Sequence, residues 1–297
     1  MKHTIFTGAA TAIITPFNGD GIDYDAYARL IDYQLDGGIS GIVVAGTTGE
    51  GSTLTDREHE ELIGFCVKRI AGRVPVIAGT GSNNTAHAIE RTVTACKAGA
   101  DAVLLVTPYY NKTTQRGLIA SFSAIADASS VPCILYNVPS RTGLNMLPET
   151  LQALSEHERI AGVKEACGNI SQVATEMALC GDALDIYSGN DDQTVPVMSL
   201  GGKGVITTIG NIMPGEMAEM CQKFFAGDIA GAAEIQLRLL KLMNHLMIET
   251  NPIPVKAACA AMGFGKYHLR LPLVEMEEKN RAKLVELMKE QGLEVTA

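Results

Sequence analysis

Residues 160–164 read Ile-Ala-Gly-Val-Lys, a short apolar run that ends in a lysine. Four consecutive apolar residues predict a strand that is covered on both faces, so that Lys164 lies where the strand meets a cleft. Burial lowers the pKa of an amine from about 10.4 towards 7 or 8, which makes the amine a usable nucleophile. The alternative is a lysine that extends into water or pairs with Glu165, and this run alone leaves both interpretations open.

Similar apolar runs recur along the chain with regular spacing. From the second run onward, successive starts lie 34, 27, 30, 28, 24 and 20 residues apart, close to the length of one strand plus one helix. Nearly continuous apolar character is typical of parallel strands with both faces covered. The runs are Ala10–Ile14, Gly41–Ala45, Pro75–Ala78, Ala102–Val106, Pro132–Tyr136, Ile160–Lys164, Leu184–Tyr187 and Gly204–Thr207.

The segments between the runs carry helix signals. Apolar residues recur on one helical face from Tyr24 to Leu35, and a Gly-Gly pair follows. Thr55 and Glu58 have the spacing of a capping box, and Pro148 suits the first turn of a helix. Eight strand and helix units in about 210 residues predict an α/β fold of the (β/α)8 TIM barrel type, because a doubly wound sheet rarely has eight evenly spaced strands.

Beyond Ile209 the pattern changes from alternating strands and helices to helices alone. We therefore divide the chain into a catalytic (β/α)8 barrel, residues 1–224, and a C-terminal helical domain, residues 225–297. No charged or low-complexity linker separates them, so we expect the tail to pack against the barrel. Helices are predicted over Glu216–Phe225, Ile229–Ile248, Val255–Met262 and Glu277–Gln291.

Composition excludes several classes of protein. The chain has 33 acidic and 24 basic residues, a net charge of −9 and no basic cluster, so a nucleic-acid partner is not expected. No apolar run reaches the roughly 18 residues that a membrane span needs, and Met1–Thr4 lacks the apolar core of a signal peptide. We expect a cytoplasmic protein without membrane association.

Cysteine and histidine spacing argues against a metal centre. The seven cysteines are an odd number, lie far apart and include no Cys-x-x-Cys pair, so neither a disulfide framework nor a zinc site is implied. The six histidines are scattered, none directly follows a predicted strand, and no His-x-His or His-Glu-x-x-His spacing occurs. A metal-dependent aldolase is disfavoured, and we expect no metal and no cofactor.

The active site of a barrel lies at the carboxyl ends of its strands, where this chain places polar residues. The loop Gly46–Glu50 offers backbone N–H groups and two hydroxyls that suit a carboxylate, although loops of this composition are often only structural turns. Tyr109, Tyr110 and Tyr136 stand at strand ends, where a tyrosine is more often a packing residue. Arg141 is either a surface charge or a carboxylate ligand. Backbone groups after the last two strands, Gly189 among them, are candidates for the floor of the site.

A lysine at a strand end, hydroxyls and groups that bind carboxylates are what Schiff-base chemistry on a 2-oxo acid requires. The lysine attacks the ketone, the iminium serves as an electron sink, and a proton shuttle removes a methyl proton to leave an enamine. A neutral phenol beside an amine nucleophile is a workable shuttle.

Almost the whole chain resembles the dihydrodipicolinate synthase family, within the N-acetylneuraminate lyase superfamily of pyruvate-dependent class I aldolases. The segments that carry the resemblance are highly specific in combination. They are Gly46–Glu50, Val106–Asn111, Tyr136–Gly143 and Gly162–Glu165. The sialate-lyase branch typically has serine at the position of Thr47 and lacks the arginine at position 141, so Arg141 chooses between the branches.

The resemblance implies a lyase of lysine and diaminopimelate biosynthesis that condenses pyruvate with L-aspartate 4-semialdehyde to give 4-hydroxy-tetrahydrodipicolinate. It implies that Lys164 forms the Schiff base with pyruvate and that Tyr136 donates and accepts protons. Thr47 and Tyr110 would complete the relay, with Tyr110 supplied by the neighbouring subunit of a tight dimer. Most family members are homotetramers built as dimers of dimers.

The family also implies a role for substrate-binding groups. The backbone around Thr47 and Thr48 and that of Ile206 would hold the pyruvate part. Arg141 would bind the carboxylate of the semialdehyde. We add Gly189 to the substrate-binding set from its position at a strand end.

One departure from the family bears on regulation. In members inhibited by lysine, the allosteric cleft at the dimer interface presents a histidine and a glutamate where this chain has Asp56 and His87. Ser52, His59, Asn83 and Tyr109 are retained. Without the glutamate, the amines of lysine lose a partner, so we expect weak or no feedback inhibition.

Two other functions remain as alternatives. One is an aldolase or lyase that cleaves a sugar-derived 2-oxo acid, against which Arg141 argues. The other is a catalytically silent barrel that binds a small carboxylate as a sensor and forms no covalent adduct. A sensor has no need for Lys164, Tyr136 and Thr47 together.

Overall fold

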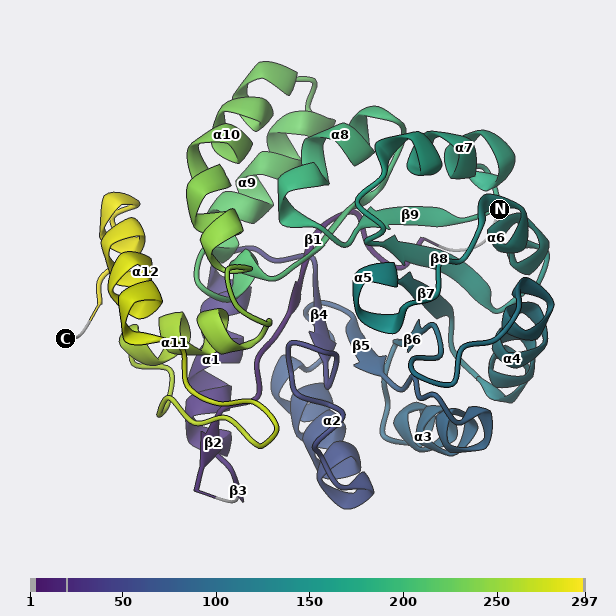
Figure 1. Cartoon of the computed structure of the whole chain (residues 1–297), viewed down its shortest axis with the longest axis horizontal. Coiled ribbons are helices and arrows are strands. Elements are labelled where there is room, and N and C mark those ends of the chain that lie inside the picture. Colours follow the sequence, from purple (N-terminus) through teal and green to yellow (C-terminus); the bar gives the residue numbers. More distant parts are fainter. Residues whose placement is uncertain (1–3, 20, 296–297) are drawn as a thin grey trace.

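The centre of the molecule is a closed barrel of parallel strands (Figure 1). A computed structural model describes residues 4–19 and 21–295, and within them eight strands close in the order β1-β10-β9-β8-β7-β6-β5-β4. The predicted (β/α)8 TIM barrel is confirmed. The strands are β1 (Gly8–Ala12), β4 (Gly41–Val44), β5 (Val76–Gly79), β6 (Ala102–Val106), β7 (Cys133–Asn137), β8 (Ile160–Glu165), β9 (Asp185–Ser188) and β10 (Gly204–Thr207).

Helices surround this barrel, as the alternating pattern predicted (Figure 1). Thr55 and Glu58 form the expected capping box: Thr55 Oγ1 accepts from the Glu58 backbone N–H, and Glu58 accepts from that of Thr55. The helices are α1 (Tyr24–Asp36), α2 (Asp56–Ile70), α3 (Thr85–Lys97), α4 (Gln115–Ala128), α5 (Pro139–Thr142), α6 (Pro148–Ser155), α7 (Ile170–Cys180), α8 (Thr194–Ser199) and α9 (Pro214–Phe225), with short 3₁₀ turns η1 (Asp191–Gln193) and η2 (Ile209–Asn211).

The first strand differs from its prediction. β1 begins at Gly8, two residues before the predicted run, because Gly8 and Ala9 already pair with the start of β10. Ile13 and Ile14 are buried but lie beyond the strand, so their apolar character reflects packing and not strand structure. A hairpin of two short antiparallel strands, β2 (Phe17–Asn18) and β3 (Gly21–Ile22), was not predicted. Each strand has only two residues, and strands this short leave no periodic signal.

The tail is helical and packs against the barrel, as expected. It consists of α10 (Ile229–His245), α11 (Ile253–Ala261) and α12 (Glu278–Glu290), with α12 against α10 and α11 (Figure 1). The predicted helix over Ile229–Ile248 ends at His245, because Met247 and Ile248 close short turns onto Asn244 and His245. None of the described helices is both long enough and apolar enough to cross a membrane. The expectation drawn from Met1–Thr4 falls mainly on residues 1–3, outside the described part.

A buried ion pair joins the tail to the loop that follows β4. Lys256 on α11 pairs with Glu50, and each side chain is only 1 % exposed. The second oxygen of Glu50 accepts the backbone N–H of Arg270 at 3.1 Å, and the ammonium of Lys256 lies 4.2 Å from the ring centroid of Phe17. Since Glu50 ends the Gly46–Glu50 loop, the tail holds a loop that faces the barrel mouth.

Removing the cation of this pair should destabilise the protein strongly. We expect Lys256→Met to lower the free energy of unfolding by about 3–5 kcal/mol, because it leaves Glu50 buried without its partner. Chemical denaturation measures the loss. Lys223→Met, which removes a partly exposed lysine paired with Asp228 and Glu219, is the matched control and should change little. Equal losses in the two variants would contradict this role of the buried pair.

Candidate active site

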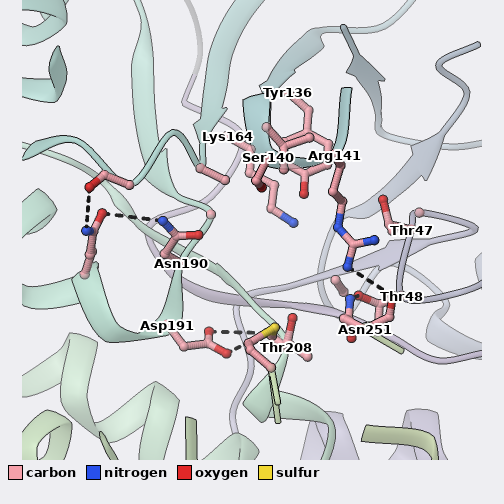
Figure 2. Close-up of a pocket in the computed structure, with 18 of the residues that line it drawn as sticks. Thr47, Thr48, Tyr136, Ser140, Arg141, Lys164, Asn190, Asp191, Thr208 and Asn251 are labelled. Carbon is pink, nitrogen blue, oxygen red and sulfur yellow. Dashed lines mark hydrogen bonds between the residues drawn. The ribbon is translucent and has the colours of Figure 1, made fainter. Parts of the chain in front are cut away.

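A cavity of about 410 Å³ opens at the carboxyl ends of the barrel strands (Figure 2). Its volume suits a small organic ligand. It brings together residues that lie far apart in the sequence, and most of the predicted site residues are among them. Those on its wall are Thr47, Thr48, Tyr136, Arg141, Lys164 and Gly189.

Lys164 points from β8 into this cavity and is 6 % exposed. Its Nζ lies 4.4 Å from the ring centroid of Tyr136, the residue of β7 that pairs with Lys164 in the register of β7 and β8. Side chains alternate along a strand, so Glu165 points the other way, where it accepts the backbone N–H of Cys167 at 2.7 Å. The alternative in which Lys164 extends into water or pairs with Glu165 is therefore wrong.

The surroundings of Lys164 favour the unprotonated amine near neutral pH. Burial lowers its pKa to about 8; the charge of Arg141 also lowers it, and that of Asp191 opposes the change. At pH 7 such a lysine has about one amine in ten unprotonated, against about one in three thousand at an ordinary lysine pKa.

Tyr136 supplies a neutral hydroxyl beside the amine. Burial raises its pKa to about 12, so the phenol keeps its proton at pH 7. The side chain of Thr47, on the loop after β4, lies close enough to Tyr136 to oppose this rise in its pKa. A phenol placed between an amine and a second hydroxyl can pass protons in either direction.

The loop that carries Thr47 and Thr48 is held in one tight conformation. The backbone N–H of Gly51 donates to the Gly46 carbonyl at 3.1 Å, and that of Glu50 donates to the Thr47 carbonyl at 3.1 Å. A Cβ on Gly51 would lie 2.0 Å from the Ala45 carbonyl oxygen, so only glycine fits there. The glycine fixes where the two threonines stand.

Arg141 reaches the cavity from α5, directly after the end of β7. Its guanidinium donates to the backbone carbonyl of Asn251 at 3.0 Å. The Asn251 side chain in turn donates to Thr48 Oγ1 at 2.9 Å, so a residue between α10 and α11 connects two of the predicted ligands (Figure 2). Sequence reasoning missed Asn251, and the only signal for it was the helix break before Pro252.

Asp191 is a buried carboxylate of the cavity to which we assigned no role from the sequence. It accepts the backbone N–H groups of Thr208 and Ile209, the latter at 2.9 Å, and so fixes the turn after β10. Thr208 lines the cavity, while Ile206, two residues earlier, is buried inside the barrel. Burial raises the pKa of Asp191, and the charge of Lys164 partly offsets this.

Tyr110 stands apart from the other predicted residues. Its side chain is 92 % exposed, and its backbone has a φ of 70°, uncommon for a residue with a side chain. A second cavity, of about 270 Å³, shares Thr47, Tyr136 and Arg141 with the first and is also lined by Tyr109. Within this one chain, Tyr110 lies outside the groups that surround Lys164.

The His, Cys, Asp and Glu side chains of the described residues are the groups from which a metal site or a disulfide would be built. In residues 4–19 and 21–295, no group of three or more His, Cys, Asp or Glu side chains is arranged to hold a metal ion. All seven cysteines are free thiols.

Known proteins resemble this chain over nearly its full length. The model of the dihydrodipicolinate synthetase family matches residues 5–291. The 4-hydroxy-tetrahydrodipicolinate synthase of Thermoanaerobacter sp. (strain X514) is 52% identical over 290 residues, which cover 97% of this chain and 98% of the relative.

Solved structures of the same kind superpose closely. Dihydrodipicolinate synthase from Aquifex aeolicus has a TM-score of 0.96 and 44% identity, and the match covers 98% of this chain and 100% of that one. The enzyme from Acinetobacter baumannii, solved in complex with pyruvate, has a TM-score of 0.95 and 40% identity over 98% and 100% of the two chains.

Proposed function

The chain belongs to the dihydrodipicolinate synthetase family, and on that premise we propose that its cavity condenses pyruvate with L-aspartate 4-semialdehyde to give 4-hydroxy-tetrahydrodipicolinate. The observation that carries the proposal is the buried Lys164, with its lowered pKa, against the ring of Tyr136. Few roles other than covalent catalysis explain an amine in that position.

Lys164 is the nucleophile in this proposal. The unprotonated Nζ attacks the ketone carbon of pyruvate, and the carbonyl oxygen leaves as water to give an iminium. Loss of a methyl proton gives an enamine, whose carbon attacks the aldehyde of the second substrate. The amine of that substrate then displaces Lys164 by transimination, which frees the enzyme.

Tyr136 and Thr47 move the protons in these steps. Both side chains line the cavity around the amine and also the second cavity beside it. Tyr110 would complete the relay from a second copy of the chain, a role that its exposed side chain makes possible. The complete relay thus requires at least a dimer, and we propose a homotetramer built as a dimer of dimers, which sedimentation would test.

The remaining groups hold the two substrates. The backbone at Thr48 and Ile206, with Gly189 at the floor, binds the pyruvate part. Arg141 binds the carboxylate of the semialdehyde in a bidentate manner. Its guanidinium is fixed at one edge by the Asn251 carbonyl, which leaves the rest of the group for the ligand.

Replacement of Arg141 should separate the two half-reactions. We expect Arg141→Ala to lower kcat/KM for the semialdehyde on the order of 10²-fold or more while the pyruvate adduct still forms, because only the second carboxylate loses its partner. Kinetics with each substrate measure this. Arg159→Ala, which removes an arginine before β8 at the other end of the strand, is the control. Loss of the adduct in Arg141→Ala, or full turnover of the semialdehyde, would contradict the assignment.

A sugar-derived 2-oxo acid is the alternative substrate, and the family relationship does not favour it. Turnover of sialate or 2-keto-3-deoxygluconate without condensation of the semialdehyde would support that alternative. We propose that the protein works in the cytoplasm. We also keep the division into a barrel, residues 1–224, and a helical domain, residues 225–297, as a proposal.

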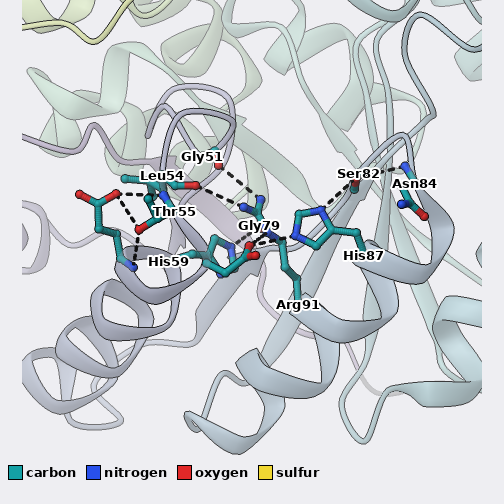
Figure 3. Close-up of polar contacts among 11 residues, drawn as sticks. Gly51, Leu54, Thr55, His59, Gly79, Ser82, Asn84, His87 and Arg91 are labelled. Carbon is teal, nitrogen blue, oxygen red and sulfur yellow. Dashed lines mark hydrogen bonds and ion pairs between the residues drawn. The ribbon is translucent and has the colours of Figure 1, made fainter.

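The residues that depart from the lysine-inhibited pattern bind one another. Asp56 Oδ1 accepts from His87 Nε2 at 2.9 Å and from Arg91 Nε at 3.0 Å (Figure 3). Arg91 also donates to the Leu54 carbonyl at 3.3 Å, while His59 faces the Gly79 carbonyl. The carboxylate of Asp56 is thus already paired with Arg91 and hydrogen-bonded to His87, and an amine of lysine would have to compete with both.

We therefore expect L-lysine to inhibit weakly or not at all. An inhibition series measured at sub-saturating pyruvate tests this, and a low-millimolar or tighter inhibition constant would contradict it. The double variant Asp56→His with His87→Glu supplies the family pattern. It should gain sensitivity to lysine relative to the natural chain.

A further inference from the structure

Two buried carboxyl groups meet behind Lys164, on the outer side of the barrel wall. Glu165 follows Lys164 on β8 and points outward, and Glu176 lies on α7; they are 3 % and 0 % exposed, and their carboxyl groups interact with each other. In the register of β7 and β8, Asn137 pairs with Glu165, and Tyr136 pairs with Lys164. The carboxyl groups thus lie against the backs of the two strands that carry the proposed nucleophile and proton shuttle.

Amide groups surround this carboxyl pair. Asn137 Nδ2 lies 3.1 and 3.0 Å from the two oxygens of Glu165, and the backbone N–H of Cys167 donates to the first of them. Gln172 Nε2 donates to Glu176 Oε1 at 2.9 Å. Glu176 Oε2 is buried and accepts no hydrogen bond from any donor within the described residues.

Among the residues that the structure describes, no cation pairs with either carboxylate. Within the described part of the chain, neither glutamate takes part in an ion pair with lysine, arginine or histidine. The titratable groups that act on the pair are the two carboxyls themselves and the Cys167 thiol on the loop between β8 and α7. From β7 the pair meets the amide of Asn137, and Cys180 on α7 donates to the Glu176 backbone carbonyl.

In such a buried site, ionisation of both adjacent carboxyl groups is unfavourable in free energy. Burial and the charge of Glu165 raise the pKa of Glu176 to about 9. A proton on Oε2 would give that oxygen a partner, because it could then donate to the carboxylate of Glu165.

We propose that Glu165 and Glu176 share one proton at neutral pH and that this pair is a positioning element for Tyr136 and Lys164. With the proton in place, the repulsion between the two carboxylates is replaced by a hydrogen bond that links Glu165 on β8 to Glu176 on α7. It fixes Glu165, which in turn holds Asn137 on the neighbouring strand. The shared proton is independent of the proposed function. Only the claim that the pair positions Tyr136 and Lys164 for catalysis rests on that function.

The shared proton has a consequence for stability. A carboxyl with a folded-state pKa above its unfolded value binds more protons in the folded state, so stability falls as pH rises between the two values. For Glu176 that window extends from about 4.5 to about 9. Glu176→Gln keeps a neutral donor in the same place and should remove this part of the pH dependence.

The first test is infrared spectroscopy of the full chain at pH 7, in which the spectrum of Glu176→Gln is subtracted from that of the natural protein. We expect a protonated carboxyl band that the variant lacks and that fades in the natural protein with a midpoint near pH 9. Glu149→Gln, which removes an exposed carboxyl on α6, should leave the band in place. Absence of the band, or parallel plots of unfolding temperature against pH for the natural protein and Glu176→Gln, would overturn the proposal. Should the variant not fold, the titration of the band in the natural protein still decides.

A kinetic ratio separates positioning from general support of the fold. If the doubly ionised form is inactive, the kcat ratio of Glu176→Gln to the natural protein rises from about one at pH 7 to about four at pH 9.5. A ratio that does not change with pH would leave only a structural role and overturn the positioning claim. Borohydride trapping of pyruvate on the same samples reports separately on the proposed function, because a missing adduct would not affect the carboxyl band.

Discussion

Lys164→Ala is expected to lower kcat/KM on the order of 10⁴-fold or more, since no other group in the cavity can form the Schiff base. Lys164→Arg should fail in the same way, because a guanidinium stays protonated at any working pH. Steady-state kinetics with both substrates measure the loss. Pyruvate should still bind without a covalent bond, because the groups at Thr48 are intact.

The control for Lys164→Ala is Lys203→Ala, which removes a lysine at the amino end of β10, on the face of the barrel away from the cavity. It should leave kcat/KM within about twofold of the natural protein, as is usual for a substitution away from the site. Retention of more than about one hundredth of the activity by Lys164→Ala would show that another residue carries the covalent step.

Tyr136→Phe is expected to lower kcat by about 10²–10⁴-fold, the usual contribution of a positioned acid and base. The ring that packs against Lys164 remains, so the pyruvate adduct should still form, more slowly, and the later proton transfers should fail. Rates of adduct formation and of overall turnover, measured separately, distinguish these steps.

Tyr33→Phe is the matched control for the Tyr136 variant. It removes another tyrosine hydroxyl, which donates to the Ile212 carbonyl at 2.9 Å, away from the cavity. We expect near-natural turnover from it. If Tyr136→Phe were as active as Tyr33→Phe, the relay would have to run through a different group.

The sequence was sufficient for the barrel because parallel strands covered on both faces are nearly continuous apolar runs. β10 is predicted to the residue at Gly204–Thr207, since glycine and a polar turn bound it. The end of α10 was less predictable, because Leu246 is fully buried although it lies beyond the helix. An apolar residue reports burial more reliably than it reports secondary structure.

The site was predictable where a strand end places a residue and unpredictable where the tail does. Lys164 and Tyr136 follow from the rule that the carboxyl ends of barrel strands form the active site. Asn251 reaches the same cavity only because the end of α10 and the segment after it line its edge, a long-range contact without local signal. Glu176 was missed for the same reason, since its partner belongs to a different element.

The central claim is that Lys164 forms a Schiff base with pyruvate on the way to condensation with the semialdehyde. Mass spectrometry after borohydride reduction in the presence of pyruvate, with semialdehyde consumption assayed on the same sample, tests it most directly. We predict a reduced pyruvyl adduct confined to the peptide that contains Lys164, together with turnover of the semialdehyde. An adduct without that turnover would point to a sugar-acid aldolase, and the absence of any adduct at Lys164 would contradict the account.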